Sequence, residues 1–243
     1  MRIFLAGATG AIGRRLAPLL VAAGHEVIGT TRSPGKVDAL RKAGLEPLVI
    51  DVFDAAALSR AVSAASPEIV VQQLTDLPPG LDPSRMAAAT YRNARVRKEG
   101  TRNLVAAALE AGVRRFIAQS IAWVYAPGVE PHTEDDPLDV HAEGGRAVSV
   151  DGVATLERLT LSSPPLLGAV LRYGHLYGPG TGVSSVSESP SLHVDAAASA
   201  ALLLVEKERS GIYNIAEPCG YLSTAKALRD LDFEAQARLD GGA

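Results

Sequence analysis

Three glycines near the start of the chain have the spacing of a phosphate-binding turn. Gly7, Gly10 and Gly13 follow the apolar run 2–6 and open into an amphipathic run that ends near Ala23. A strand, a glycine turn and a helix in this order let backbone N–H groups at the helix N-terminus face a pyrophosphate. The pattern predicts a dinucleotide site; the alternative is an ordinary turn between a strand and a helix. The residues expected to contact the cofactor here are Gly7, Thr9, Gly10, Ala11, Ile12 and Gly13.

The residues after the second predicted strand, 25–30, favour NADP(H) over NAD(H). A site that prefers NAD places an acidic residue at the end of this strand, where it binds the ribose 2′-hydroxyl. This chain has Arg32 and Ser33 instead, and Arg14 of the first helix is close enough to help them hold a 2′-phosphate. The alternative is that Arg32 is a solvated loop arginine.

Further cofactor contacts are expected where later strands end. Ligands of doubly wound sheets bind at the carboxyl ends of the parallel strands. Asp51 follows the third predicted strand, where its carboxylate either meets the adenine amino group or caps the next helix. The other cofactor contacts predicted at strand ends are Val52, Leu74, Thr75, Gln119 and Tyr173.

The elements that must position these residues alternate along the whole chain. Apolar strands separated by helical runs predict an α/β fold, a doubly wound parallel sheet of the Rossmann type with helices on both faces. We expect one Rossmann-type domain over 1–243, with a small C-terminal substrate-binding portion made mainly by 173–195 and 217–243. The strands are expected at 2–6, 25–30, 46–50, 68–72, 115–119, 166–172 and 211–216, and the two longest helices at 84–111 and 145–161.

Composition excludes several classes of protein. The formal net charge is −3 with the charges scattered, so neither a nucleic-acid partner nor a membrane-surface partner is expected. One cysteine, Cys219, leaves no internal disulfide and no cysteine pair for a metal, which fits a reducing, cytoplasmic compartment. The first apolar run is broken by Gly7, so we expect neither a signal peptide nor a membrane span. The predicted partner is a small-molecule substrate, and the predicted state is a monomer or homodimer with no metal.

Six motifs together resemble the extended or atypical short-chain dehydrogenase/reductase superfamily, the relatives of nucleotide-sugar epimerases and dehydratases. They occur in the expected order and span nearly the whole chain, so the resemblance implies a Rossmann fold and a nicotinamide cofactor. The motifs are Gly7-Ala-Thr-Gly-Ala-Ile-Gly13, Gly100-Thr-Arg-Asn-Leu-Val105, Val124-Tyr125, Leu171-Arg-Tyr-Gly174 with Tyr177-Gly-Pro179, His193-Val-Asp195 and Gly211-Ile-Tyr-Asn214.

The catalytic residues of that superfamily do not carry over to this chain. Its catalytic serine or threonine is replaced by Ile121, and its tyrosine and lysine by Ser149 and Val153. The asparagine that usually lies three residues before the helix glycine is Arg97. Isoleucine and valine cannot donate a proton, and Ser149 lacks the ammonium partner that would activate it.

A ketone reduced by hydride transfer leaves an alkoxide, which must be protonated. The predicted catalytic residues are Ser120 and Tyr125, and His175 is a further candidate for the proton donor. Water or a hydroxyl of the substrate are the other sources. The alternative for each side chain is structural: Ser120 bonding backbone, Tyr125 packed in the core with its hydroxyl satisfied, and His175 ordering its loop.

The predicted substrate pocket contains Ser120, Trp123, Tyr173 and His175, and its tryptophan suits a flat, aromatic substrate. We therefore expect an NADPH-dependent ketoreductase for an aromatic or polyketide-type ketone. The overall pattern, with the usual catalytic residues lost, resembles that of atypical ketoreductases of the simocyclinone 7-ketoreductase type, which tailor polyketide antibiotics. The alternatives are a nucleotide-sugar epimerase or dehydratase, and a non-catalytic NADP(H)-binding regulator.

The segment between Gly180 and His193 is short where the superfamily usually places a long substrate lid. Either the pocket is unusually open, or a lid is missing from this sequence.

Overall fold

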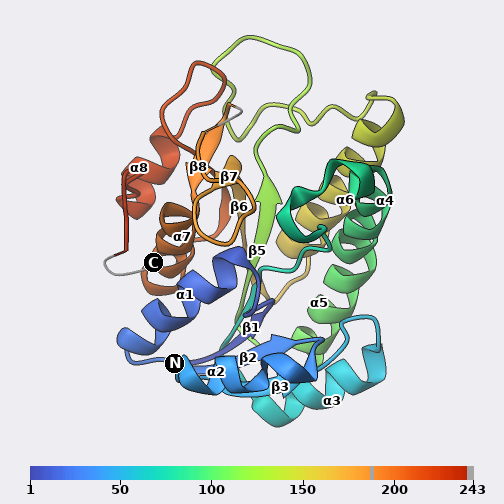
Figure 1. The fold of residues 1–243 in the computed structure, drawn as a ribbon, viewed down its shortest axis with the longest axis vertical. Coiled ribbons are helices and arrows are strands. Elements are labelled where there is room, and N and C mark those ends of the chain that lie inside the picture. The colour runs from blue at the N-terminus through green and yellow to red at the C-terminus, as the bar shows by residue number, and fades with distance from the viewer. Residues whose placement is uncertain (187–188, 240–243) are drawn as a thin grey trace.

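Seven parallel strands form one twisted sheet at the centre of the molecule (Figure 1). The computed structural model of the chain describes residues 1–186 and 189–239. Every neighbouring pair of strands is parallel. In spatial order the strands are β3 (Glu46–Val49), β2 (Glu26–Thr31), β1 (Arg2–Ala6), β4 (Ile69–Gln72), β5 (Arg115–Ile121), β6 (Leu167–Tyr173) and β9 (Gly211–Ile215).

Helices cover both faces of the sheet, as a doubly wound fold requires (Figure 1). One face carries α1 (Ala11–Ala22), α2 (Val37–Lys42), α7 (Val194–Lys207) and α8 (Ala225–Leu231). The other face carries α3 (Ala55–Ala65), α4 (Pro83–Arg95), α5 (Thr101–Glu110) and α6 (Gly144–Leu161). Short 3₁₀ turns lie at Pro34–Lys36 and Pro79–Leu81. The predicted fold class is confirmed.

The alternation of side chains along β1 explains the two layers of core. Ile3 and Leu5 point into the apolar cluster under α1 and α7, whereas Phe4 and Ala6 point into the cluster under α3 and α5. Successive residues of a strand point to opposite faces of the sheet, so a strand buried on both sides must be apolar throughout. This is why the short run before Gly7 contains no charged residue after Arg2.

Several predicted bounds are corrected by the structure. The expected helix 84–111 is two helices, α4 and α5, joined by a π-helical turn at Val96–Gly100. Strand β5 runs two residues beyond the predicted end, to Ile121, because β6 continues to hydrogen-bond with it. In the tail, the backbone N–H of Ser223 bonds to the carbonyl oxygen of His132 in a distant loop, and α8 begins only at Ala225.

Two short strands lie where the sequence indicated only turns. β7 (His175–Tyr177) and β8 (Ser191–His193) pair in parallel beside the carboxyl end of the main sheet. Gly174 lets the two segments approach, since an added Cβ there would lie 2.8 Å from the carbonyl oxygen of Pro190. A pairing between residues so far apart in sequence has no local signal.

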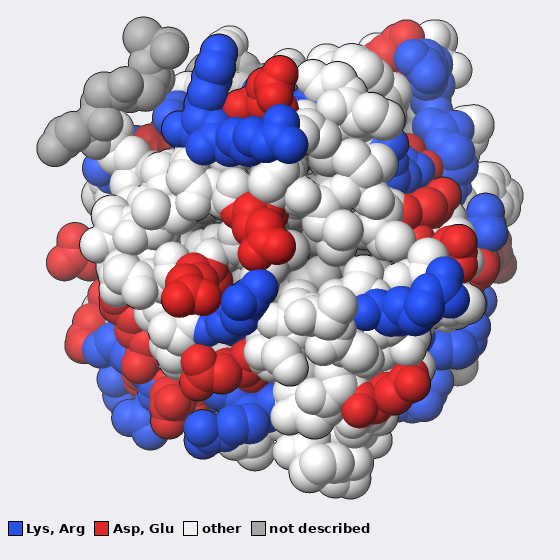
Figure 2. All heavy atoms as spheres, turned by 90° about the horizontal axis from the view of Figure 1, so that it is seen from below, with Lys and Arg blue, Asp and Glu red and all other residues white. Residues whose placement is uncertain are grey.

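The predicted substrate-binding portion, 173–195 and 217–243, is described except for residues 187–188 and 240–243, which lie outside the described residues. Its elements β7, β8 and α8 gather at one end of the fold (Figure 1). No helix within 1–186 and 189–239 is long and apolar enough to span a membrane. The face shown in Figure 2 carries basic and acidic side chains intermingled, which agrees with the scattered charges of the sequence.

Candidate functional site

A cleft of about 420 Å³ lies over the N-terminal end of α1, where β1, β2 and β4 end. This is the edge of a doubly wound sheet where ligands bind. Two predicted contacts at later strand ends, Leu74 and Thr75, lie in its wall beside the glycine turn. The predicted cofactor residues that line the cleft are Gly7, Thr9, Gly10, Ala11, Arg32, Ser33, Val52, Leu74 and Thr75.

The glycine turn fits a pyrophosphate because no side chain separates the ligand from the backbone. Gly7 has φ +89°, and an added Cβ would lie 2.6 Å from the carbonyl oxygen of Gln73. An added Cβ on Gly13 would lie 2.2 Å from the carbonyl oxygen of Gly7, so this glycine lets α1 pack against the turn. Gly10 begins α1 with no side-chain cap, so the first N–H groups of the helix stay available to an anion.

Ile12, Gly13 and Gln119 do not line the cleft. Ile12 is buried in the core under α1, and Gly13 lies beneath the turn. Gln119 is half-buried near the end of β5, some strands away from the glycine turn.

Asp51 and Tyr173 also lie outside the lining of the cleft. The exposed carboxylate of Asp51 accepts a hydrogen bond from the backbone N–H of Phe53 at 3.0 Å, so it caps a turn. The hydroxyl of buried Tyr173 donates to the carbonyl oxygen of Ala197 at 3.2 Å, beneath α7. Burial raises the pKa of Tyr173.

Three cations, Arg14, Arg32 and Lys36, line the cleft, and no aspartate or glutamate does among the described residues. Arg32 is half-exposed, and its Nη2 atom lies 3.4 Å from Oδ1 of Asp76. Lys36 was not among the predicted site residues, although it follows Arg32 by four positions in the same loop. This charge distribution fits an anionic 2′-phosphate.

The second wall of the cleft comes from two loops: one was not assigned to any site, and the other belongs to the predicted substrate-binding portion 173–195. The residues 77–81 after β4 and the pair Gly180-Thr181 after β7 both line it. The two loops touch, because an added Cβ on Gly182 would lie 2.8 Å from the backbone of Gly80. Residues 180–182 therefore lie at the cofactor cleft. In the sequence, the glycines of these two loops were the only feature that could have indicated this wall of the cleft.

The positions of the missing acid–base residues form an apolar cluster. Ile121 and Val153 pack with Val124 and Val150 in the core between β5 and α6. The third position, Ser149, is half-buried, and its hydroxyl donates to the carbonyl oxygen of Gly145 at 3.2 Å. Ile121 and Val153 carry no proton donor, and the hydroxyl of Ser149 is bonded to the backbone of its own helix.

The predicted catalytic hydroxyls of Ser120 and Tyr125 belong to a buried polar network. Ser120 donates to Oε1 of Glu157 at 2.8 Å, and Glu157 is paired with Arg172 at 2.7 Å. Tyr125 accepts from Nη1 of Arg172 at 2.8 Å and donates to Oδ1 of Asn214 at 2.6 Å. Burial raises the pKa of Tyr125, and the neighbouring guanidinium opposes this shift. Both hydroxyls are fully engaged inside the protein.

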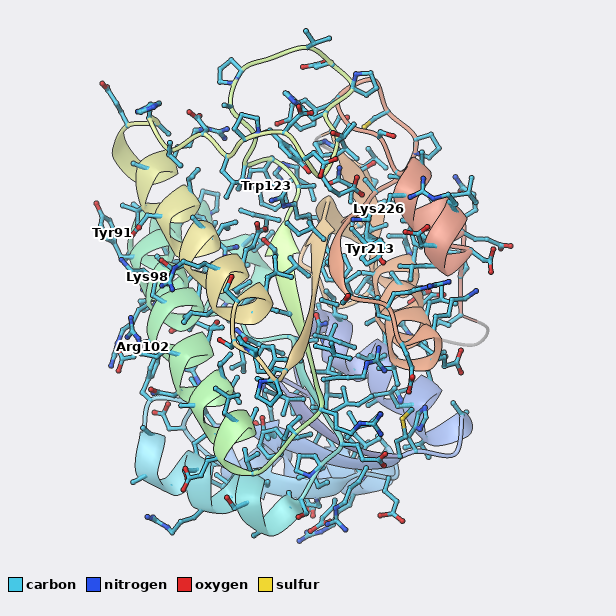
Figure 3. The ribbon with its side chains drawn as sticks, turned by 180° about the vertical axis from the view of Figure 1, so that it is seen from behind. Tyr91, Lys98, Arg102, Trp123, Tyr213 and Lys226 are labelled. Carbon is cyan, nitrogen blue, oxygen red and sulfur yellow. The ribbon has the colours of Figure 1, made fainter. Side chains whose placement is uncertain are left out.

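Trp123 and His175 lie together beyond the carboxyl ends of β5 and β6. Their rings stack with centroids 3.8 Å apart and an interplanar angle of 13°. Figure 3 shows Trp123 among the loops above β5. Both side chains are half-buried, so this stacked aromatic pair keeps part of its surface exposed at the predicted substrate end of the sheet. The 1–186 and 189–239 segments contain no group of three or more His, Cys, Asp or Glu residues that could hold a metal ion.

The fold, the glycine turn and the uncapped helix define a Rossmann protein that binds a dinucleotide. A family model described as NAD(P)H-binding matches residues 7–144. A Streptomyces relative, the 3-diazoavenalumate denitrifying reductase, is 43% identical over 239 residues, covering 89% of this chain and 76% of the relative. The chain belongs to the NAD(P)H-binding family.

Solved structures of the epimerase and dehydratase type share the fold. The UDP-glucose 4-epimerase of Thermotoga maritima is 21% identical, with a TM-score of 0.76 over 98% of this chain and 94% of that chain. The dTDP-glucose 4,6-dehydratase DesIV of Streptomyces venezuelae is 20% identical, with a TM-score of 0.76 over 98% of this chain and 93% of that chain. These likenesses show that the chain shares the Rossmann fold of these proteins, and the family match assigns it an NAD(P)H-binding fold.

Proposed function

We propose that this protein is an NADPH-dependent reductase that delivers hydride to an aromatic small molecule. Arg14, Arg32 and Lys36 without a carboxylate in the described lining support NADPH over NADH. The aromatic surface of Trp123 and His175 supports a flat acceptor. When bound, the reduced nicotinamide supplies the hydride.

The observation that carries the choice of acceptor is the apolar cluster at Ile121 and Val153. A ketone needs a proton as its alkoxide forms, and the usual donor is missing. An aromatic diazonium does not need that proton. Its ring carbon gains the hydride with its electron pair, the carbon–nitrogen bond breaks, and dinitrogen leaves with the electron pair of that bond.

The Streptomyces relative supports this chemistry, since its name describes a reductase that removes nitrogen from a diazo compound. We therefore propose an aromatic diazo compound as the acceptor, reduced to the arene with release of dinitrogen. The net reaction of the diazonium form consumes one hydride and no proton. The protein then has to bind and orient the substrate and exclude other nucleophiles from it.

An aromatic ketone is the second candidate, because the Trp123 surface would accept one equally well. Ser120 and Tyr125 are engaged with Glu157 and Asn214, so the proton would come from water or from a hydroxyl of the substrate. An epimerase or dehydratase is disfavoured, since it must first oxidise an alcohol and needs a base for that step.

The test supplies the full chain with a diazotised aminohydroxybenzoate and NADPH carrying deuterium at the transferred position. We expect release of dinitrogen and deuterium on the ring carbon that carried the diazo group, above the rate without protein. Turnover of a panel of aromatic ketones but not of the diazo compound would replace the first candidate with the second. Tight NADPH binding without oxidation by either class would favour a regulator and overturn the proposal.

A further inference from the structure

Arg97 is a buried cation without a partner in the described part of the chain. Its exposed fraction is 8%, and no hydrogen bond or ion pair joins it to a residue of 1–186 and 189–239. None of its nitrogens is among the fully enclosed polar atoms that lack a partner, so the guanidinium still reaches solvent-accessible space. Burial lowers the pKa of Arg97 to about 10, and the charge of Glu157 opposes this shift. A guanidinium this deep is only partly hydrated, so an anion that reached it would pair with it favourably.

Glu157 cannot serve as that partner, because its carboxylate is already occupied. Arg172 holds both of its oxygens, with Nε at 2.9 Å from Oε1 and Nη2 at 2.7 Å from Oε2. Ser120 donates a third hydrogen bond to Oε1. Two buried arginines therefore share one buried carboxylate, and the region around Arg97 keeps an excess positive charge.

The neighbours of Arg97 along its helix define the direction in which this residue faces. One turn earlier, Asn93 accepts a hydrogen bond from the backbone N–H of Asp76, in the loop after β4. One turn later, Thr101 accepts from Nε2 of Gln72 at the end of β4. Arg97 lies between these two contacts, so its face of the helix is turned toward the carboxyl edge of the sheet.

The surroundings of Arg97 place it beside the cofactor cleft. Val96, the preceding residue, lines that cleft. Both residues belong to the π-helical turn at Val96–Gly100, and such turns occur frequently at functional sites. The side chain packs toward Gly152 of α6, where an added Cβ would lie at ordinary contact distance, 3.5 Å, from Cδ of Arg97. The next residue, Lys98, instead lies on the outer surface of the helix layer (Figure 3).

We propose that Arg97 binds an anionic oxygen, a carboxylate or phenolate, of the aromatic acceptor. This inference rests on the proposed function, because it assigns the substrate group that the reductase holds. A guanidinium and a carboxylate or phenolate form short, charge-assisted hydrogen bonds that fix the orientation of a planar ligand. The bound anion supplies the negative charge that the residues around Arg97 do not provide. It also holds the ring beside the cleft that receives the cofactor.

The test measures binding, so that it does not depend on turnover. The full chain loaded with NADP⁺ is titrated by calorimetry with para-hydroxycinnamate, with its methyl ester, and with its para-methoxy analogue. Arg97→Gln should weaken binding of the acid by about tenfold or more, as expected for loss of a hydrogen bond to a charged group. Arg97→Lys should retain part of the affinity. Weaker binding of the methyl ester to the wild type would identify the carboxylate as the bound group, and weaker binding of the para-methoxy analogue would identify the phenolate.

Arg102→Gln is the matched control, since Arg102 is exposed on the outer surface of α5 (Figure 3). It should bind the acid as the wild type does, and all variants should bind NADPH equally. Arg97→Met separates a binding role from a structural one: its melting temperature without ligand should equal or exceed that of the wild type, because an unpaired buried charge is removed.

Two results would overturn the inference. One is equal binding of the acid by the wild type and Arg97→Gln, or no binding by either. The other is a lower melting temperature of Arg97→Met, which would give Arg97 a structural role. Anion binding that depends on Arg97 in a protein without turnover of diazo compounds or ketones would instead refute the proposed reaction and leave this inference standing.

Discussion

The hydroxyl of Ser120 donates a hydrogen bond to Oε1 of Glu157 at 2.8 Å, in the core between β5 and α6. The same carboxylate is held on both oxygens by Arg172 of β6. The serine next to the expected catalytic position therefore joins three neighbouring elements of the fold. Its role in the structure is to complete the hydrogen bonding of a buried ion pair.

The first prediction separates stability from chemistry at this serine. Ser120→Ala should lower the free energy of unfolding by about 1.5–3 kcal/mol, because one hydrogen bond to a buried carboxylate is lost. The rate of NADPH oxidation should stay close to that of the wild type. Denaturant unfolding and steady-state kinetics measure the two effects. A large loss of turnover at unchanged stability would instead make Ser120 the proton donor.

The second prediction concerns cofactor preference. Arg32→Ala should raise the dissociation constant for NADPH about tenfold or more while changing that for NADH little, because one cation near the 2′-phosphate is lost. Calorimetric titration with both cofactors measures this, with Arg41→Ala as the control. Arg41 is exposed on α2 and pairs with Asp38. An equal effect on both cofactors would remove Arg32 from the phosphate site.

The third prediction concerns the close packing of the glycine turn. Gly13→Ala should lower the free energy of unfolding by more than about 3 kcal/mol, since the new methyl group would meet the carbonyl oxygen of Gly7 and backbone atoms of Ala8. Gly35→Ala is the control, because nothing lies within 4 Å of an added Cβ there. Thermal melts of both variants would test it. Equal stability of the two variants would contradict the close approach of α1 to the turn at Gly13.

The fourth prediction uses Trp123 as the only tryptophan of the chain. Its ring stacks on His175, so His175→Ala should change its fluorescence in the free protein. Binding of an aromatic acceptor against this surface should change the emission of the wild type. Addition of an aliphatic ketone of similar size is the control. An emission spectrum that an aromatic ligand leaves unchanged at saturation would place the substrate elsewhere.

The sequence by itself determined the fold and the phosphate-binding turn. Glycine spacing and the alternation of strands and helices are local patterns, and each reflects a backbone requirement that acts within a few residues. The prediction of NADP(H) over NAD(H) was equally local, since Arg32 and Ser33 follow β2 directly. Ile121 and Val153 could be identified as departures because their places relative to nearby motifs are fixed.

Tertiary structure alone decided which polar groups meet. Ser120, Glu157 and Arg172 belong to three separate elements, and no spacing in the sequence indicates that they share one buried site. The contact between the loops at Gly80 and Gly182 closes the cleft from segments far apart in the chain. From the sequence, Arg97 could be identified only as a replacement of the asparagine that usually occupies its position in the superfamily. Its burial without a partner among the described residues depends on packing against α6 and on the prior pairing of Glu157, which only the folded chain establishes.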